Sequence, residues 1–501
     1  MELSIAAFLA DAADRSGESV AVVFDQADLT YGQLWDQARR FAGALRDRGI
    51  GPGDRIALLM GNSPEFPAVY FGVLALGAAV VPVNTLLRAA EITYVLRDSG
   101  ALALVSDAAS LDSARAAAES ADLPVLLATM TAAPLPAYVP TEGSDIAVIL
   151  YTSGTTGRAK GVVLTHASVA MNVAVTALSP FEFGSGDVLL GALPLFHTFG
   201  QICGMCVCFR AGAKLVLMSR FDPAQALELL WAQSCTVFMG VPTMYYDLLR
   251  AAGSSAESSR DRIYSLERAY SGGAALPPQI LNRFREVFGC EIYEGYGLTE
   301  TSPVVAYNDR SAPIKPGTVG RPIWGIQVEI ARSELASRIE LLPQGAVGEI
   351  VIRGHNVMAG YLNRPEATAE VLVDGWLRSG DLGRKDADGY LSIIDRKKDL
   401  IVRGGYNVYP RELEDVLAGH PDIAQVAVIG VPDERLGQDV CAVVIIRDGI
   451  AVEDATAAGI ISWARDRLAA YKYPRRIVFV AEFPVGPSGK VLKRELAARI
   501  A

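Results

Sequence analysis

The sequence predicts an α/β protein with a large N-terminal domain of parallel sheets covered by helices, followed by a small α+β domain. Short apolar strands alternate with helical stretches over Ser19–Ser106 and Val188–Met239, a pattern typical of parallel sheets. Beyond Val304, strands rich in Gly and Pro predict a small β subdomain. The charge cluster Asp395–Asp399 then precedes a self-contained pattern of helices and strands. The expected boundaries are 1–395 for the large domain, about 305–395 for its β subdomain and 396–501 for the C-terminal domain.

Composition narrows the classes of partner. The 501 residues are 51% hydrophobic and 20% charged, which is typical of a globular protein with several cores. A formal net charge of −10 argues against nucleic acid or an anionic membrane surface as a partner, because both attract basic patches. The N-terminus lacks the basic segment of a signal peptide.

The six cysteines are too few for a disulfide framework in so long a chain, and they predict a reducing, cytoplasmic location. Three of them, Cys203, Cys206 and Cys208, have apolar neighbours and no fourth ligand nearby. We interpret these three as buried thiols rather than as a zinc site.

The first third of the chain supplies strands and helices in alternation. We expect strands at Val20–Phe24 and Arg55–Met60, with a helix from Thr30 to Leu45 between them. The uncharged run Phe66–Val83 is nearly long enough to cross a bilayer, but proline and glycine interrupt it. It predicts a buried helix followed by a buried strand, and so no membrane segment.

A polar loop follows the apolar strand Ile146–Leu150. It places hydroxyl side chains beside glycines in the run Thr152, Ser153, Gly154, Thr155, Thr156 and Gly157. Glycine lets backbone N–H groups approach a phosphate, the hydroxyls add donors, and Arg158 or Lys160 can add positive charge. The Gly-Lys-Ser/Thr ending of a Walker A loop is absent. By itself, the loop therefore leaves a phosphate site and a plain polar hairpin as alternatives.

Further elements follow this loop. Thr165 can cap a helix that runs to Leu178, and we interpret His166 in its first turn as a surface residue. The next elements expected are a strand at Val188–Leu193, a helix after His197, a strand at Lys214–Met218, a helix at Pro223–Ala232 and a strand at Thr236–Met239. The small polar residues of Ala251–Arg260 predict a mobile surface loop. In the last domain we expect a helix at Pro410–Leu417, strands at Val426–Ile429 and Val440–Ile446, and a helix from about Glu453 to Ala470.

Three more clusters carry side chains that suit a nucleoside triphosphate. In Tyr293–Glu300, an aromatic ring between glycines can stack on a base, a hydroxyl can donate to a phosphate, and a carboxylate can hold Mg²⁺. The segment Asp374–Asp381 ends in a carboxylate that can accept the hydroxyls of a ribose. Pro487–Lys490 is a turn that presents one lysine.

Together with the polar loop, these clusters resemble the motifs of the adenylate-forming superfamily. This superfamily includes acyl- and aryl-CoA synthetases, peptide-synthetase adenylation domains and beetle luciferases. The likeness covers essentially the whole chain, with the motifs in the expected order, and points towards bacterial fatty-acyl-CoA synthetases. It implies ATP, Mg²⁺ and CoA as cofactors. It also implies that a carboxylate attacks the α-phosphorus of ATP, releases pyrophosphate, and passes as acyl-AMP to the thiol of CoA.

The resemblance implies a role for each matching residue. The loop Thr152–Gly157 and Lys160 would hold the β- and γ-phosphates. The base and the ribose would be held by Gly273, Ala274, Glu294, Tyr296, Gly297, Asp381 and Arg396. Thr299 would contact the α-phosphate, Glu300 would ligate Mg²⁺, and Lys490 would reach the reacting carboxylate. Lys398 would be the hinge, at 396–399, of a mobile C-terminal domain that rotates between the two steps. CoA would pass Gly404, Gly405 and Tyr406, with Lys472, Arg475 and Arg476 near its phosphates.

The matching acyl pocket is lined by Phe196, Phe199, Val241, Met244 and Gly272, with His197 at its carboxylate end. These lining residues are uncharged. The run from His197 has no aspartate for a substrate ammonium, and Gly295 stands where malonate activators carry an arginine. We therefore expect a monocarboxylic acid with a hydrocarbon body, and favour a medium- or long-chain fatty acid over an aryl acid. The sequence leaves open an acyl carrier protein in place of CoA, and a homodimer.

Overall fold

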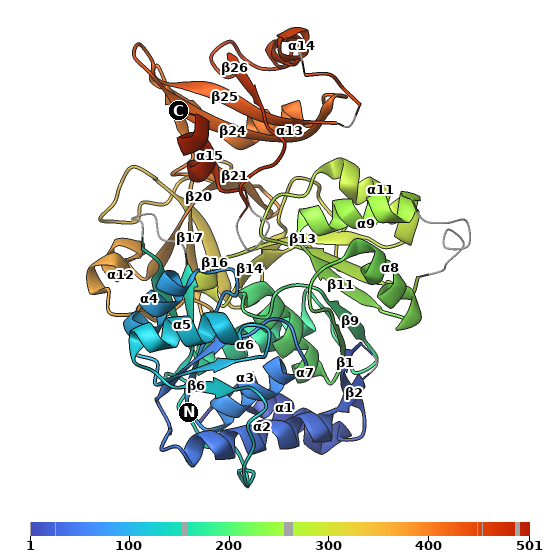
Figure 1. Ribbon diagram of the computed structural model, residues 1–501. Coiled ribbons are helices and arrows are strands. Elements are labelled where there is room, and N and C mark those ends of the chain that lie inside the picture. Colours follow the sequence, from blue (N-terminus) through green and yellow to red (C-terminus); the bar gives the residue numbers. More distant parts are fainter. Residues whose placement is uncertain are drawn as a thin grey trace. The chain divides into compact units, whose positions relative to one another are not determined.

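A computed structural model describes residues 2–25, 27–152, 158–254, 264–447, 449–452, 454–485 and 491–500 (Figure 1). The chain forms two compact units, which are described separately: unit 1 is Met1–Val328 with Ile352–Leu377, and unit 2 is Glu329–Val351 with Arg378–Ala501. The division falls within β16 (Ile326–Ala331), β17 (Gly348–Gly354) and β20 (Trp376–Lys385), so the expected β subdomain contributes to both units. The domain boundary at residue 395 and the hinge at 396–399 stay predictions.

The first sheet of unit 1 has a parallel centre. Its strand order is β15 (Arg321–Pro322), β14 (Val304–Tyr307), β13 (Ile292–Gly297), β12 (Arg268–Ser271), β11 (Val237–Gly240), β9 (Val188–Gly191), β10 (Lys214–Leu217), β1 (Val20–Phe24) and β2 (Ala27–Thr30). The run from β13 to β1 is parallel, whereas β2, β14 and β15 pair antiparallel at the edges. The alternation of strands and helices therefore predicted the centre correctly, but not the edges.

The second sheet of unit 1 carries the polar loop. Its strand order is β18 (Gly360–Tyr361), β8 (Lys160–Thr165), β7 (Ile146–Thr152), β4 (Ala79–Val83), β3 (Arg55–Leu59), β5 (Ala103–Ser106) and β6 (Val125–Leu127). The strands from β7 to β6 are parallel, and β8 returns antiparallel to β7. The segment that joins β7 to β8 is therefore a hairpin connection at the carboxyl end of a parallel strand.

The helices of unit 1 mostly follow the expected pattern. They are α1 (Ala7–Ser16), α2 (Tyr31–Arg46), α3 (Glu65–Ala75), α4 (Ala89–Ser99), α5 (Leu111–Ala121), α6 (His166–Leu178), η1 (Phe199–Cys206), α7 (Val207–Ala211), α8 (Pro223–Ala232), α9 (Pro242–Ser254), α11 (Pro278–Phe288), η2 (Thr299–Thr301) and α12 (Pro365–Val371). The run Phe66–Val83 forms the buried helix α3 and the buried strand β4, as expected. Gly77 between them has φ +76°, a conformation that glycine adopts without strain.

The start of α6 corrects one expectation. Thr165 caps the helix, because its hydroxyl accepts from the backbone N–H of Ser168 at 3.1 Å. His166, however, is fully buried rather than on the surface, and its Nδ1 accepts from the backbone N–H of Ile5 at 3.2 Å. The apolar N-terminal segment covers this histidine, and an interpretation based on the position of His166 in its own helix could not foresee that contact.

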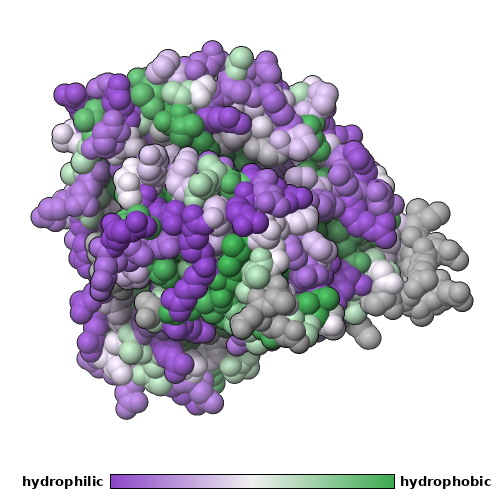
Figure 2. Space-filling view, turned by 90° about the horizontal axis from the view of Figure 1, so that it is seen from above, coloured by the Kyte–Doolittle hydropathy of each residue, from purple (hydrophilic) through white to green (hydrophobic). Residues whose placement is uncertain are grey.

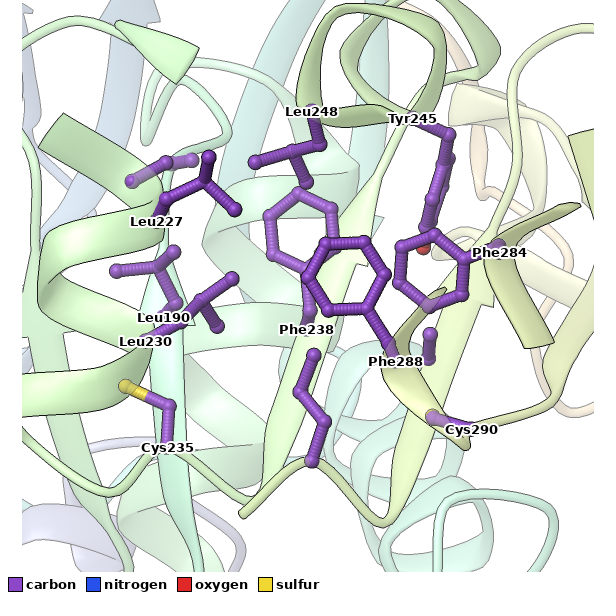
Figure 3. Close-up of a cluster of buried hydrophobic side chains, with 14 of the residues drawn as sticks. Leu190, Leu227, Leu230, Cys235, Phe238, Tyr245, Leu248, Phe284, Phe288 and Cys290 are labelled. Atoms are coloured by element: carbon purple, nitrogen blue, oxygen red, sulfur yellow. The ribbon is translucent and has the colours of Figure 1, made fainter. Parts of the chain in front are cut away.

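A core of large side chains lies between α8, α9, α11 and the strands β9 and β11 (Figure 3). Aromatic rings fill its centre: the ring centroids of Phe238 and Tyr245 are 5.2 Å apart, as are those of Tyr245 and Phe284. Helix α9 reaches Ser254, and Ala251 packs against this core, so the loop expected at Ala251–Arg260 was wrong over its first four residues. Residues 255–263 lie outside the described residues.

Unit 2 contains a sheet with the strand order β23 (Tyr406–Val408), β22 (Ile401–Arg403), β25 (Gly437–Ile446) and β24 (Ile423–Asp433); β26 (Arg476–Phe479) pairs with β25, and β21 (Leu391–Arg396) with β20. Its helices among the described residues are α13 (Pro410–Leu417), α14 (Asp454–Arg465) and α15 (Lys493–Ile500). Helix α13 has the expected bounds, but α14 ends before the expected Ala470. The chain turns after Arg465, and Leu468 and Tyr471 pack against the core of this unit.

The cysteines are all free and buried. Burial raises the pKa of Cys206 and of Cys235 to about 12, so these thiols stay protonated near neutral pH. A cytoplasmic location stays a prediction. On the face drawn in Figure 2, hydrophilic residues cover most of the surface, with hydrophobic ones between them. None of the helices in the described ranges has both the length and the apolar character that a membrane span requires.

Candidate active site

Four neighbouring parallel strands of unit 1 bring predicted site residues to one edge of a sheet. Strand β9 leads into the segment with His197 and Phe199, β11 ends before Val241, β12 ends before Gly272, and β13 carries Glu294 at its middle and Tyr296 near its end. Because the strands are parallel, their carboxyl ends meet at the same edge, where α/β proteins bind ligands. The structure therefore brings together residues that lie about 100 positions apart in the chain.

The segment after β12 forms a tight wall with two predicted pocket residues. A Cβ added at Gly272 would lie 3.4 Å from the Phe199 ring and 3.5 Å from the Tyr307 hydroxyl. A Cβ at Gly273 would lie 3.7 Å from Val241 Cγ1. Phe199 and Val241 are buried, whereas the predicted pocket residues Phe196 and Met244 are half-buried. Gly272 thus lies beside the apolar Phe199 ring and the Tyr307 hydroxyl, with room for a Cβ in ordinary van der Waals contact but for little more.

His197 lies just before this wall, and its ring is oriented by the backbone. Its Nδ1 accepts from the backbone N–H of Phe199 at 3.3 Å, which leaves the proton of the neutral ring on Nε2. Burial lowers the pKa of His197 below its ordinary value, so the ring is neutral near pH 7. The helix expected after His197 is a π-helix, η1, a form that often marks functional sites.

The end of β13 provides the predicted base site. Glu294 is buried, and its Oε1 accepts from the backbone N–H of Leu276 at 3.3 Å, which ties the strand to the segment after β12. Tyr296 is half-buried, whereas Gly273, Ala274 and Gly297 are exposed. These exposed positions can present backbone groups to a ligand.

Tyr307 explains why glycine occupies position 295. A Cβ at Gly295 would lie 2.2 Å from the Tyr307 ring, so an arginine could not stand there without displacing that ring. Tyr307 is buried and also closes the space behind Gly272. Sequence reasoning missed it, although the apolar strand Val304–Tyr307 after the motif could have indicated a buried aromatic wall.

The polar hairpin is anchored at its base. Thr152 and Lys160 lie opposite each other in the β7–β8 register, and both are half-buried. Ser153, Gly154, Thr155, Thr156 and Gly157 lie outside the described residues.

Asp98 on α4 stabilises this hairpin from the side. It accepts from the Tyr151 hydroxyl at 2.8 Å and pairs with Arg364 at 2.8 Å. Tyr94, on the same helix, donates to the carbonyl of Ala159 at 2.9 Å. The sequence motifs gave no indication of this network, because its members are distant in the chain.

Glu300 lies in η2 next to Thr299, and both are half-buried. The Tyr361 hydroxyl donates to Glu300 Oε1 at 3.0 Å, and Met358 N–H donates to the Glu300 carbonyl at 2.9 Å. Lys160 Nζ lies 5.0 Å from the centroid of the Tyr361 ring. Tyr361 therefore joins the base of the hairpin to the predicted metal ligand, and it was also missed at the sequence level.

The surroundings of Glu300 fit a hard cation that is shared with a phosphate ligand. Carboxylate oxygens suit Mg²⁺, which usually binds through one or two carboxylates plus substrate phosphates and water. Across the described ranges, no cluster of three or more His, Cys, Asp or Glu side chains could hold a metal alone. A single carboxylate that shares the ion with bound phosphates and water is an arrangement that Mg²⁺ adopts with nucleotides.

Unit 2 carries the predicted ribose and hinge residues. Asp381 and Arg396 lie opposite each other in the β20–β21 register, and Arg396 Nε is 3.1 Å from Asp381 Oδ1. Lys398 is exposed, but its ammonium group is partly shielded from water. This shielding is the main cause that lowers its pKa, and the positive charge of Arg396 is the second. The adjacent Lys397 donates to the Ser333 carbonyl at 2.5 Å. Lys490 lies outside the described residues.

The residues predicted near CoA are also in unit 2. Gly404 and Gly405 have φ of +56° and +84°, and Tyr406, 60% exposed, stacks on Tyr471 with ring centroids 4.8 Å apart. The three basic side chains are already engaged: Lys472 with Glu412 at 2.6 Å, Arg475 over the Tyr473 ring at 3.7 Å, and Arg476 with the Ile500 carbonyl at 3.2 Å. To contact CoA phosphates, these side chains would have to give up or share these partners.

These features describe an α/β protein with candidate ligand-binding residues at one edge of a parallel sheet. Comparisons with known proteins show its family. The model of the AMP-binding enzyme family matches residues 9–362, and that of the AMP-binding enzyme C-terminal domain matches residues 412–490. A feruloyl-CoA synthase of an Amycolatopsis species is 38% identical over 488 residues, which are 97% of this chain and 96% of that protein. A long-chain-fatty-acid–CoA ligase of Bacillus subtilis is 34% identical over 535 residues, 98% of this chain and 94% of that protein.

A solved structure extends the comparison to the fold. The crystal structure of ATP-bound MatB from Rhodopseudomonas palustris matches with a TM-score of 0.90 and 31% identity, over 100% of this chain and 99% of that one. The chain belongs to the AMP-binding enzyme family. It is an acyl- or aryl-CoA ligase of the AMP-forming type. The mixed α/β architecture expected from the sequence is confirmed.

Proposed function

We propose that this ligase activates a hydrophobic monocarboxylic acid, with a medium- or long-chain fatty acid as its substrate, Mg²⁺ as its metal and CoA as the acceptor. The apolar wall at Phe199, Val241 and Gly272 beside a neutral His197 carries this proposal. A second carboxylate or an ammonium on the substrate would have to be desolvated against this wall without a partner, which is unfavourable. The long-chain-fatty-acid–CoA ligase of Bacillus subtilis supports the choice of acid.

In the first step, the residues of unit 1 hold the reactants in place. Lys160 and the loop Thr152–Gly157 hold the β- and γ-phosphates, and Thr299 contacts the α-phosphate. Tyr296, Glu294 and the exposed backbone at Gly273, Ala274 and Gly297 hold the base. His197 presents Nε2–H to the acid carboxylate without adding charge. Glu300 would hold Mg²⁺, and the ion would offset the repulsion between a carboxylate and a triphosphate.

Residues of unit 2 serve both steps. Asp381 binds the ribose hydroxyls with Arg396 beside it, and Lys490 stabilises the charge that develops at the reacting carboxylate. A rotation at Lys398 then replaces Lys490 with the strip at Gly404, Gly405 and Tyr406, along which CoA reaches the acyl-AMP. We propose an acyl carrier protein as the alternative acceptor, and a homodimer as the assembly.

An aryl acid is the second candidate, and two observations favour it. The feruloyl-CoA synthase relative has the higher identity, 38% against 34% for the fatty-acid ligase. In addition, the aromatic Phe199 and Tyr307 lie beside Gly272, and an aryl ring can stack on aromatic side chains.

Thioester formation with a matched set of acids separates these candidates. We would measure kcat/KM with CoA for saturated acids of 6, 8, 10, 12 and 16 carbons, for benzoate and for ferulate. Each buried CH₂ is worth about 0.8 kcal/mol, so kcat/KM should rise about fourfold per methylene until the pocket is full. A flat response to chain length together with faster turnover of ferulate would assign the enzyme to aryl acids. If no acid gives a thioester with CoA, but the acyl group is transferred to an acyl carrier protein, then the carrier protein is the acceptor.

A further inference from the structure

Tyr361 contacts two charged residues of the proposed nucleotide site, although no sequence motif singled it out. Its hydroxyl donates to Glu300 Oε1 at 3.0 Å, and its ring lies beneath Lys160 Nζ at 5.0 Å. Burial and, next, the charge of Glu300 raise the pKa of Tyr361 above its ordinary value. In this contact the phenol O–H is the donor and the carboxylate is the acceptor.

The backbone fixes the position of Tyr361. Strand β18 pairs with β8 so that Tyr361 lies opposite Val162, and the N–H groups of Tyr361 and Leu362 donate to Thr368 Oγ1 at 2.9 Å and to the Gly161 carbonyl at 2.8 Å. Lys160 lies two residues before Val162 on the same face of β8. The two side chains are therefore diagonal neighbours across the strands, which explains the ring–ammonium contact.

We propose that Tyr361 is a positioning residue: its hydroxyl holds the Glu300 carboxylate in the orientation that binds Mg²⁺, and its ring holds the Lys160 ammonium towards the phosphates. This inference rests on the proposed function, in which Glu300 and Lys160 serve those roles. A carboxylate that is already oriented loses less freedom when it binds a metal. Partners of metal-ligating side chains typically change metal affinity about 10–100-fold when they are removed.

The test uses the full-length protein with ATP but no acid, and Mn²⁺ as the probe. Free Mn²⁺ is measured by electron paramagnetic resonance, and ATP binding without metal by calorimetry. Tyr361→Phe keeps the ring and removes the hydroxyl, so it should weaken Mn²⁺ binding about tenfold and leave metal-free ATP binding unchanged. Tyr361→Leu also removes the ring, and should weaken metal-free ATP binding about threefold through Lys160.

Tyr151→Phe is the matched control. It removes a phenol–carboxylate hydrogen bond of 2.8 Å, to Asp98, at the base of the same hairpin, but this carboxylate is not Glu300. We expect it to leave Mn²⁺ binding unchanged. Mn²⁺ affinity of Tyr361→Phe equal to that of the wild type, or an equal loss in Tyr151→Phe, would overturn the proposal. A wild-type protein that neither binds Mn²⁺ with ATP nor exchanges pyrophosphate would instead overturn the proposed function.

Discussion

Protonation of His166 should destabilise the large unit at mildly acidic pH. The ring is fully buried, Nδ1 accepts from the Ile5 N–H at 3.2 Å, and Nε2 has no hydrogen-bond partner among the described residues. A second proton on the ring would bind at Nδ1. It would break the hydrogen bond from the Ile5 N–H, because two donors would then face each other, and it would place a positive charge in the core. Burial accordingly lowers the pKa of His166 from 6.5 to about 4, and the charge of Asp145 offsets this only in part.

The sign and size of the effect follow from the two pKa values. Below pH 6.5 His166 is protonated in the unfolded chain, whereas in the folded chain it is protonated only below about pH 4. The free energy of unfolding therefore falls as the pH drops through that window. At pH 5 the unfolded residue is almost fully protonated, whereas about one tenth of the folded residue is. The linkage relation then gives a loss of about 2 kcal/mol relative to pH 8, and about 3 kcal/mol when the window has been crossed.

Urea unfolding between pH 8 and pH 5 measures this loss. Trp35, Trp231, Trp324 and Trp376 lie in unit 1, so tryptophan fluorescence reports mainly on its transition. His166→Asn is the control variant, since its side-chain oxygen can still accept from Ile5 but does not titrate. The difference in unfolding free energy between wild type and variant should change by about 2 kcal/mol across this range. If the two curves run parallel with pH, the reasoning about His166 is wrong.

Three further predictions concern the reaction. Glu300→Gln should raise the Mg²⁺ concentration for half-maximal acyl-AMP formation at least tenfold, because a neutral amide is a weaker ligand; a Mg²⁺ titration checks this. Gly272→Val should lower kcat/KM for the acid at least tenfold and leave the KM for ATP unchanged, since its Cβ alone would lie 3.4 Å from the Phe199 ring; an equal effect on both substrates would contradict the pocket. Lys490→Ala should abolish acyl-AMP formation but spare thioester formation from supplied acyl-AMP, whereas Lys398→Pro should do the reverse by fixing φ at the hinge. Equal losses in both half-reactions would contradict domain rotation.

Local patterns predicted the elements well where the decisive interactions are local. Helix α8 has the predicted bounds Pro223–Ala232, because Asp222 caps it and proline occupies its first turn. Thr165 was correctly identified as the cap of α6 for the same reason. The pairing of β8 with β18 was not foreseen, because it joins residues about 200 positions apart.

In the candidate site, too, the residues with a local sequence motif could be predicted, whereas the residues brought in by tertiary packing could not. Glycine and polar residues after apolar strands predicted Glu294, Tyr296 and Glu300 at the ligand edge of a parallel sheet. The structure places the first two on β13 and Glu300 in η2, and their roles stay predictions. The supporting residues Tyr307, Tyr361 and Asp98 carry no motif of their own, and only tertiary packing brings them to the site. The prediction that His166 lies on the surface was wrong. A polar residue at a helix start is usually exposed, but the N-terminal segment covers this one.

We expect this enzyme to activate an acid as its adenylate before any thiol takes part. Exchange of labelled pyrophosphate into ATP, measured without CoA, tests this most directly. We predict exchange that requires both Mg²⁺ and a hydrophobic monocarboxylic acid, and that disappears when the acid is left out. If no acid of the panel supports exchange at millimolar ATP, or if exchange does not depend on the acid, the enzyme does not form an acyl-adenylate as its first step.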